Sequence, residues 1–166
     1  MPDPFGFEEF YEATRHRVAA FLYAVGGDLA EAQDAAQEAY TRAWQRWSRV
    51  GSYDDPEAWV RMVGYRIMIN AWRRARNRLA AHRRQEAALP YRPVPDDTLT
   101  VRAALRQLPP DQRLVVVLPH LLDLPVADIA RQTGVPVNTV KTRLARGRRR
   151  LATLIGVDLP EEATNA

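Results

Sequence analysis

A polar and basic stretch from Asn138 to Leu151, NTVKTRLARGRRRL, carries the side chains best suited to binding chemistry in this 166-residue chain. It holds six basic residues and no acid, and its amide and hydroxyl groups come before its arginines. Guanidinium and ammonium groups bind phosphate oxygens, whereas amide and hydroxyl groups form hydrogen bonds with the edges of bases. The stretch therefore predicts a surface that binds a nucleic acid and reads part of its sequence.

Groups that could do covalent or metal chemistry are not arranged for it in the sequence. The chain has no cysteine, its three histidines are isolated, and its only serines are Ser48 and Ser52. A nucleophile elbow, a phosphate-binding glycine loop and a paired histidine and carboxylate are all missing. The sequence predicts a protein that is not an enzyme and has no metal and no cofactor. The lack of cysteine suits a reducing cytoplasm.

The charges are divided along the chain, although the formal net charge is only +4 and the pI is about 9.8. Residues 1–57 hold 11 acids and five arginines, a balance of −6. Residues 58–84 then hold eight arginines, and residues 131–151 hold seven basic residues, in both cases without an acid. Two basic blocks and one acidic block predict two contacts with a polyanion and one with a different partner. Either basic block alone is also compatible with a solvated helix surface.

Three helices must position the first basic block. Apolar residues recur at three- and four-residue steps over residues 7–21 and again over 29–47, which predicts two amphipathic helices. The glycines at 26 and 27 separate them, and Asp28 is suited to cap the second helix. Asp55 and Pro56 favour the start of a third helix, from Glu57 to Arg78. Its predicted apolar stripe is Val60, Val63, Ile67 and Ala71.

The second half of the chain also reads as helical. Residues 79–97 lose the periodicity and gather prolines, which predicts a flexible Pro-rich linker. A helix is predicted from Thr98 to Leu108, and Pro119 is expected to kink or split the next one. No convincing strand is found. The predicted fold class is therefore all-α, with two small helical domains at 5–78 and 98–155 joined by the linker at 79–97.

A helix-turn-helix is predicted in the segment VADIARQTGVPVNTVKTRL. Gly134 supplies the turn, and the second helix starts at about Pro136 or Val137. Val140 and Leu144 lie on its inner stripe, so the opposite side would enter the major groove of duplex DNA. A helical hairpin with a basic tail is the alternative. The predicted DNA contacts are Asn138, Thr139, Lys141, Thr142, Arg143, Arg146 and Arg149, with Arg148 and Arg150 on phosphates and one arginine free to pair within the domain.

Three segments together resemble the extracytoplasmic-function (ECF) group of bacterial sigma-70 factors. They are DLAEAQDAAQEAYTRAWQRW, DDPEAWVRMVGYRIMINAWRRARNR, and the stretch that runs from ALRQLPPDQR to RLARGRRRL. Their order and spacing also match, and the resemblance covers about residues 5–154. It implies a sigma-2-like domain and a sigma-4-like helix-turn-helix domain, which bind core RNA polymerase and direct it to promoters.

The resemblance also implies roles for individual residues. The sigma-4-like domain would read the −35 element as a duplex, and the third helix would melt and read the −10 element. Arg66 stands where many members have asparagine, so their −10 base preference is not carried over to this chain. The −10 contacts implied are Arg66, Asn70, Arg73, Arg74, Arg76 and Arg78. The contacts implied for the coiled coil of the largest catalytic polymerase subunit are Asp34, Gln37, Glu38, Tyr40, Arg42 and Trp44.

Partners and location follow from the same resemblance. Core RNA polymerase and promoter DNA are the expected partners, and whether an anti-sigma factor also binds is left open. We expect Asp34, Gln37 and Glu38 to be exposed. The N-terminus lacks a signal-peptide pattern and no segment approaches 18 consecutive apolar residues, so we expect a cytoplasmic protein that does not insert into a membrane.

Two other classes of protein compete with this interpretation. A stand-alone helix-turn-helix regulator would use its N-terminal part to sense a ligand or to dimerise, and the free protein would bind duplex DNA tightly. A sigma factor would bind DNA weakly alone and bind core polymerase stably. A protein that sequesters another sigma factor is disfavoured, because both basic blocks are intact.

Overall fold

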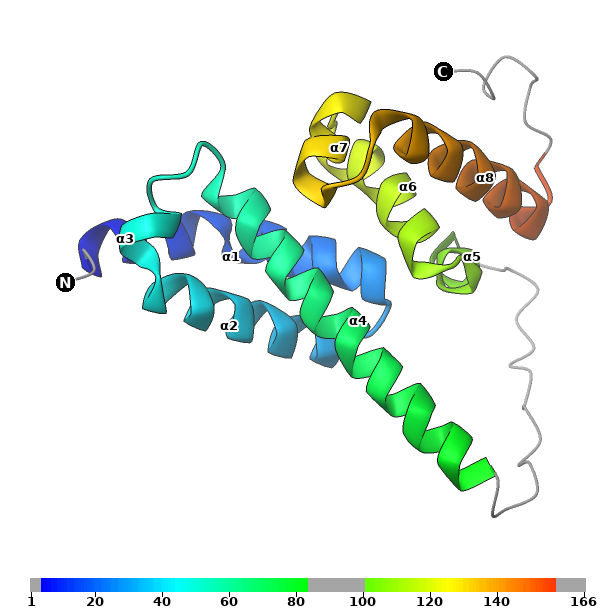
Figure 1. Ribbon diagram of the computed structural model, residues 1–166, viewed down its shortest axis with the longest axis horizontal. Coiled ribbons are helices and arrows are strands. Elements are labelled where there is room, and N and C mark those ends of the chain that lie inside the picture. The colour runs from blue at the N-terminus through cyan, green and yellow to red at the C-terminus, as the bar shows by residue number, and fades with distance from the viewer. Residues whose placement is uncertain (1–3, 84–100, 158–166) are drawn as a thin grey trace.

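The computed structural model describes residues 4–83 and 101–157, and every regular element in these two ranges is an α-helix (Figure 1). This confirms the all-α prediction. Four helices precede the undescribed segment and form the N-terminal domain, and four follow it and form the C-terminal domain. They are α1 (Pro4–Gly26), α2 (Leu29–Gln45), α3 (Trp47–Val50), α4 (Pro56–Arg83), α5 (Val101–Gln107), α6 (Pro110–Leu122), α7 (Val126–Thr133) and α8 (Val137–Ile155).

Side-chain caps fix two helix starts as predicted. The Asp28 carboxylate accepts a hydrogen bond of 2.9 Å from the backbone N–H of Glu31 at the start of α2. The Asp55 carboxylate accepts one of 2.8 Å from the N–H of Ala58, and α4 begins at Pro56. Each carboxylate satisfies a donor that has no partner inside the helix. The single turn α3 was not predicted, because four residues are too few to show periodicity.

Helix α4 differs from the prediction in its length and in its apolar stripe. It continues to Arg83, five residues into the predicted linker, because the segment LAAHR consists mostly of good helix formers and contains no proline. Val60 and Val63 are buried as expected, but Ala71 is exposed. Figure 1 shows why, since the C-terminal half of α4 projects beyond the other helices. The predicted linker residues 84–97, and residues 98–100, lie outside the described ranges.

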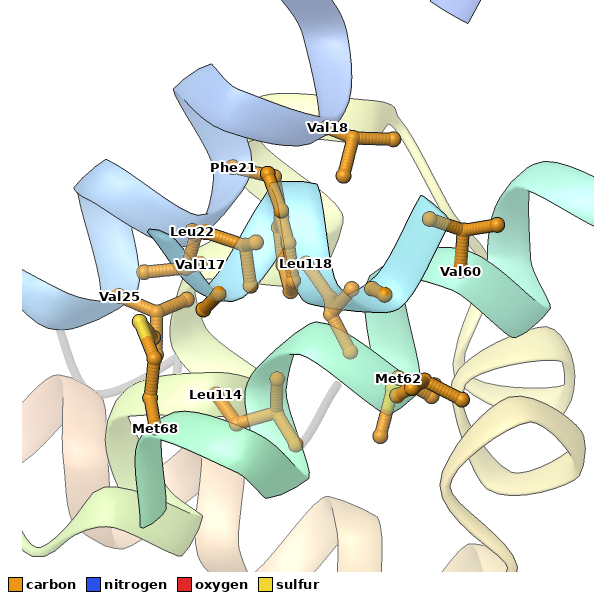
Figure 2. Close-up of a cluster of buried hydrophobic side chains, with 14 of the residues drawn as sticks. Val18, Phe21, Leu22, Val25, Val60, Met62, Met68, Leu114, Val117 and Leu118 are labelled. Atoms are coloured by element: carbon orange, nitrogen blue, oxygen red, sulfur yellow. The ribbon is translucent and has the colours of Figure 1, made fainter. Parts of the chain in front are cut away.

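One apolar core joins the two domains. Phe21 and Leu22 of α1 are fully buried, and they belong to the same cluster as Leu114 and Leu118 of α6. Figure 2 shows these side chains, together with Met68 of α4, converging between the helices. The C-terminal domain therefore packs on the side of the N-terminal domain that α1 and α4 form. Burial of these large apolar side chains stabilises the seam.

Pro119 was expected to kink or split its helix, and it does not split it. Helix α6 runs from Pro110 to Leu122 with Pro119 inside it. It ends at Asp123, whose backbone is left-handed with φ of 51°. Pro119 is only three residues from the end of the helix, so its missing N–H removes a single hydrogen bond near the last turn, where the loss is least costly.

The helix-turn-helix forms as predicted from α7 and α8. Gly134 has φ of 70°, a left-handed conformation that glycine adopts without steric cost, and its N–H donates to the Ala130 carbonyl at 2.9 Å. Helix α8 starts at Val137 and buries Val140, Leu144 and Gly147. At Gly147, a Cβ atom would lie 2.7 Å from Val116 Cγ2 on α6. Helices α6 and α8 thus approach closely because this residue has no side chain.

The Gly147→Val variant is expected to be less stable than the wild type by about 1–3 kcal/mol, because overpacking forces α8 away from Val116. Urea unfolding followed by circular dichroism measures the change. Ala145→Val, on the same helix but not fully buried, is the matched control and should change the midpoint little. An unchanged midpoint for Gly147→Val would show that the close approach of the two helices is not needed.

Candidate nucleic-acid and protein interfaces

The outer side of α8 presents the predicted duplex-binding residues. Asn138, Lys141, Thr142, Arg146 and Arg149 are exposed, whereas Thr139 and Arg143 are half-buried. No side chain caps the start of α8, so its first N–H groups and the positive end of the helix dipole remain available to a phosphate. The Thr142 hydroxyl donates to the Asn138 carbonyl at 2.9 Å, which fixes its rotamer.

Arg143 is the basic residue of α8 that pairs within the domain. Its Nε lies 3.1 Å from Asp111 Oδ2 at the start of α6. The sequence allowed for one such arginine but did not identify it. The ion pair holds the recognition helix against α6, and it leaves Lys141 and Arg146 as the exposed cations nearest the N-terminal end of α8.

A basic surface also covers the outer side of α4. Its six predicted residues, Arg66, Asn70, Arg73, Arg74, Arg76 and Arg78, are all exposed. Arg66, Asn70, Arg74 and Arg78 follow at four-residue steps, so they share one side of the helix. Among the described residues none of the five arginines forms an ion pair. Their charges are therefore free to meet an anionic backbone.

A cavity of about 490 Å³ opens at the start of this basic surface. Arg66 lines it, but Asn70, one turn further along α4, does not. Its other walls include Trp59 and the loop residues Tyr53, Asp54 and Asp55, while Arg131 and Gln132 enter from α7 of the C-terminal domain. The sequence did not identify these lining residues. The segment DDPEAW holds three of them, Asp54, Asp55 and Trp59, and it was interpreted as a helix start.

The acidic side of α2 faces solvent. Asp34, Gln37 and Glu38 are exposed, which confirms the expectation. Arg42 is exposed as well, and its Nε lies 2.8 Å from Glu38 Oε1, one helical turn away. The pair is open to water and contributes little to stability, so both side chains remain available to a partner.

Tyr40 belongs to the core of α2 rather than to its outer side. Its side chain is 4% exposed, and its hydroxyl lies 2.8 Å from the Thr14 hydroxyl. Burial raises the pKa of Tyr40 to about 12. Little of Tyr40 is thus open to a partner, although the residue lines a groove of about 270 Å³ between α1 and α2.

Aromatic residues of α1 complete this groove. Phe7 packs against Trp44, with ring centroids 5.0 Å apart, and Tyr11 packs edge-on against Tyr40 at 4.9 Å. Trp44 remains 38% exposed at the mouth of the groove. Phe7 and Tyr11 were not predicted as surface residues, because their spacing fitted a buried stripe. The groove places an apolar surface directly beside the acidic residues of α2.

Tyr40 gives a testable pH dependence. The ordinary tyrosine pKa is about 10, so between pH 10 and 12 the unfolded chain releases this proton while the folded chain retains it. The stability due to neutral Tyr40 is complete below pH 10 and is lost as the pH rises to 12. Urea midpoints measured across this range should fall less steeply for Tyr40→Phe. Tyr53→Phe, on the surface, is the control, and equal slopes for Tyr40→Phe and the wild type would contradict the prediction.

Other kinds of site were also sought in residues 4–83 and 101–157. These ranges contain no group of three or more histidine, cysteine, aspartate or glutamate residues placed to hold a metal ion. Within them, no helix combines the length and the apolar character needed to cross a membrane.

Comparisons with protein families match each helical domain separately. The model of sigma-70 region 2 matches residues 10–78, which include α2, α3 and most of α4. The model of sigma-70 region 4 matches residues 98–151, which include the helix-turn-helix. Both basic surfaces and the acidic side of α2 lie inside the matched segments.

Individual relatives match most of the chain. It is 32% identical over 138 residues to the ECF RNA polymerase sigma factor SigL of Mycobacterium tuberculosis, which covers 78% of each protein. It is also 32% identical over 161 residues to SigM of the same organism, or 93% of this chain and 79% of that protein. Among solved structures, the sigma factor RpoE of Bartonella quintana, in complex with the anti-sigma factor NepR, shares the fold. The TM-score is 0.70 at 24% identity, over 92% of this chain and 98% of that one.

Proposed function

The chain belongs to the extracytoplasmic-function group of the sigma-70 family, and on this premise we propose how its surfaces act. It is a sigma factor, which binds core RNA polymerase and directs transcription initiation at promoters. The observation that carries this function is the match of regions 2 and 4 to two helical domains that each present a basic surface. The protein supplies promoter recognition, and the chemistry of RNA synthesis belongs to the polymerase.

The −35 element is read by α8. Its N-terminal residues enter the major groove, where Lys141 and Arg146 contact base edges or the adjacent phosphates, and Arg149 lies along the backbone. A recognition helix needs small or hydrogen-bonding side chains first and cations later, which is the order found here. Arg143 contributes mainly by holding α8 on Asp111.

The −10 element is melted and read by α4. The exposed arginines on α4 line up along the separated strand, and the cavity beside Arg66 accepts an unpaired base. Trp59 forms one wall of that cavity, and the loop carboxylates of Asp54 and Asp55 can accept hydrogen bonds from a base amino group.

Core polymerase binds the acidic side of α2. Asp34, Gln37 and Glu38 would meet a basic surface of the coiled coil, and an apolar side chain of the partner would enter the groove beside Trp44. These residues belong to the acidic block at residues 1–57, and a surface that binds DNA would not need an excess of acids.

We also propose an anti-sigma factor as a regulator, supported by the complex of Bartonella quintana RpoE with NepR. We also propose a cytoplasmic location, since core RNA polymerase and promoter DNA are the main partners.

Reconstitution tests the function directly. The purified chain is mixed with bacterial core RNA polymerase, followed by gel filtration and run-off transcription on fragmented genomic DNA. The expected result is co-elution with core and transcripts that core alone does not make. Tight binding of the free protein to duplex DNA, without co-elution, would instead favour the stand-alone regulator.

A further inference from the structure

Three arginines of the C-terminal domain converge on the C-terminal end of α1. Arg113, on α6, is the most buried of them at 6% exposed. Its guanidinium donates at 2.8 Å to the Val25 carbonyl of the N-terminal domain. It also donates to the carbonyls of Arg106 and Leu108 in its own domain, at 2.8 and 3.0 Å. One side chain thus ties the last turn of α1 to the start of the C-terminal domain.

The charge on Arg113 is held by backbone carbonyls, since none of the described ion pairs includes it. The last carbonyls of a helix have no partner inside it and carry the negative end of the helix dipole. Val25 lies in that last turn of α1, and the ring of Trp72 on α4 lies 5.5 Å from the guanidinium carbon. A cation buried in this way depends on its partners remaining in place.

Arg102 and Arg106 of α5 contact the same corner. The guanidinium carbon of Arg102 lies 4.4 Å from the centre of the Tyr23 ring, and its Nη2 is 3.5 Å from the Gly27 carbonyl. The Arg106 side chain lies on Gly27 so closely that a Cβ atom there would be 2.7 Å from Arg106 Cδ. Gly27 has φ of 81° and lacks a side chain, so α5 can pack closely against the turn after α1.

The seam also brings α7 to the cavity beside Arg66. Gln132 of α7 lies 3.4 Å from Nη2 of Arg61, a buried residue of α4, and Arg131 forms part of the cavity wall. In the closed arrangement the C-terminal domain therefore covers part of the site proposed for the −10 base.

The spacing of the two promoter elements argues against this closed arrangement as the one that binds both of them. The −35 and −10 elements are centred about 25 base pairs apart, roughly 85 Å of duplex at about 3.4 Å per pair. The longest helix in the described ranges, α4, has 28 residues and spans only about 42 Å at 1.5 Å per residue. With α6 packed on α1, the two basic surfaces belong to one packed unit built of helices no longer than this, which is far from the span between the two elements.

The contacts at this corner are incomplete. Within the described residues, the buried Nε of Arg113 has no acceptor. Arg102 is exposed, so water can replace its contacts. An unsatisfied buried donor lowers the cost of separating the domains, because water would satisfy it in the open form.

We propose that Arg102, Arg106 and Arg113 form a latch that holds the two domains closed in the free protein, and that the latch opens before both promoter elements are bound. This inference rests on the proposed function. While the latch is closed, the C-terminal domain covers part of the −10 site, and it does so until another interaction separates the domains.

The absence of cysteine allows a direct test. In the double variant Tyr23→Cys, Arg102→Cys, a short bis-maleimide bridges the latch corner, away from α8 and the acidic side of α2. The bridged protein is expected to lose at least nine-tenths of its run-off transcription with core polymerase, whereas the unbridged double variant transcribes. Each single variant, capped with N-ethylmaleimide, is the matched control and should also transcribe. Undiminished transcription by the bridged protein would overturn the latch. Failure of the wild type itself to transcribe with core would overturn the proposed function and the latch together.

Small-angle scattering of the free protein gives a second test. Arg113→Met is expected to increase the radius of gyration, and Arg102→Ala to increase it by a smaller amount. Arg102→Ala is included because Arg113 also forms hydrogen bonds within the C-terminal domain, so the Arg113→Met substitution can unfold that domain. The control is Arg150→Ala, on the exposed side of α8, which should leave the radius unchanged. A wild-type radius equal to that of a folded Arg113→Met variant would contradict the latch.

Discussion

Asp34→Arg combined with Gln37→Ala is expected to abolish stable binding to core RNA polymerase and to leave the C-terminal domain intact. Both side chains are exposed on α2 beside Glu38, in the acidic part of the chain. Reversing one charge against a basic partner turns an attraction into a repulsion, and close charge pairs across interfaces are worth about 1.5–7 kcal/mol. We expect a loss of about 2–4 kcal/mol, which is roughly a 30- to 1,000-fold weaker complex. Titration of labelled core polymerase measures it.

Glu9→Arg is the matched control for that experiment. Glu9 is an exposed acid of the same domain, but it lies on α1, on the side away from Phe7 and Tyr11. It changes the net charge as Asp34→Arg does, so it separates local contact from overall charge. Core binding by the double variant that equals that of Glu9→Arg would show that α2 is not the polymerase surface. Circular dichroism must show native helix content in both proteins.

Lys141→Ala or Arg146→Ala is expected to weaken recognition of the −35 element by about 1–3 kcal/mol if the side chain contacts a base. That free energy corresponds to roughly a 5- to 150-fold loss. Core binding should not change, because α8 belongs to the other domain. The readout is run-off transcription from a fixed promoter at increasing holoenzyme concentration, together with the same titration on templates with altered −35 sequence.

Arg150→Ala distinguishes the reading of bases from contact with phosphates. Arg150 is exposed on α8 two turns or more beyond Lys141, so its charge is expected to meet the backbone. Its loss should weaken all templates alike and reduce the salt dependence of binding, whereas loss of Lys141 or Arg146 should also relax the preference for the native −35 sequence. Equal losses on native and altered templates for all three variants would mean that α8 does not read sequence.

Local signals in the sequence explain which parts of the fold could be predicted. The caps at Asp28 and Asp55, the turn at Gly134 and the buried stripe of α8 each depend on a few neighbouring residues, and all four are confirmed. The end of α4 and the exposure of Ala71 were predicted wrongly, because periodicity does not reveal where a neighbouring helix ends.

The seam between the domains could not be predicted from the sequence. Arg113 reads as one more surface cation in PPDQR, but its guanidinium meets Val25, which is 88 residues earlier in the chain. Tyr40 was likewise assigned to a surface by resemblance alone. Its position three residues before Ala43 and four after Ala36, both buried, is the local pattern that would have placed it in the core.

The projecting half of α4 has a consequence for how the helix behaves when DNA arrives. From Arg73 to Arg78 it is largely exposed, and Arg74 and Arg78 lie four residues apart, a spacing at which like charges repel. These turns therefore rely on their own peptide hydrogen bonds, which hardly sustain a short isolated helix in water. A phosphate backbone alongside would cancel the repulsion, so amide hydrogen exchange in this half should slow markedly in the complex. Separation of the DNA strands would then be coupled to stabilisation of this half of α4. The DNA would thus stabilise the same helix that separates its strands.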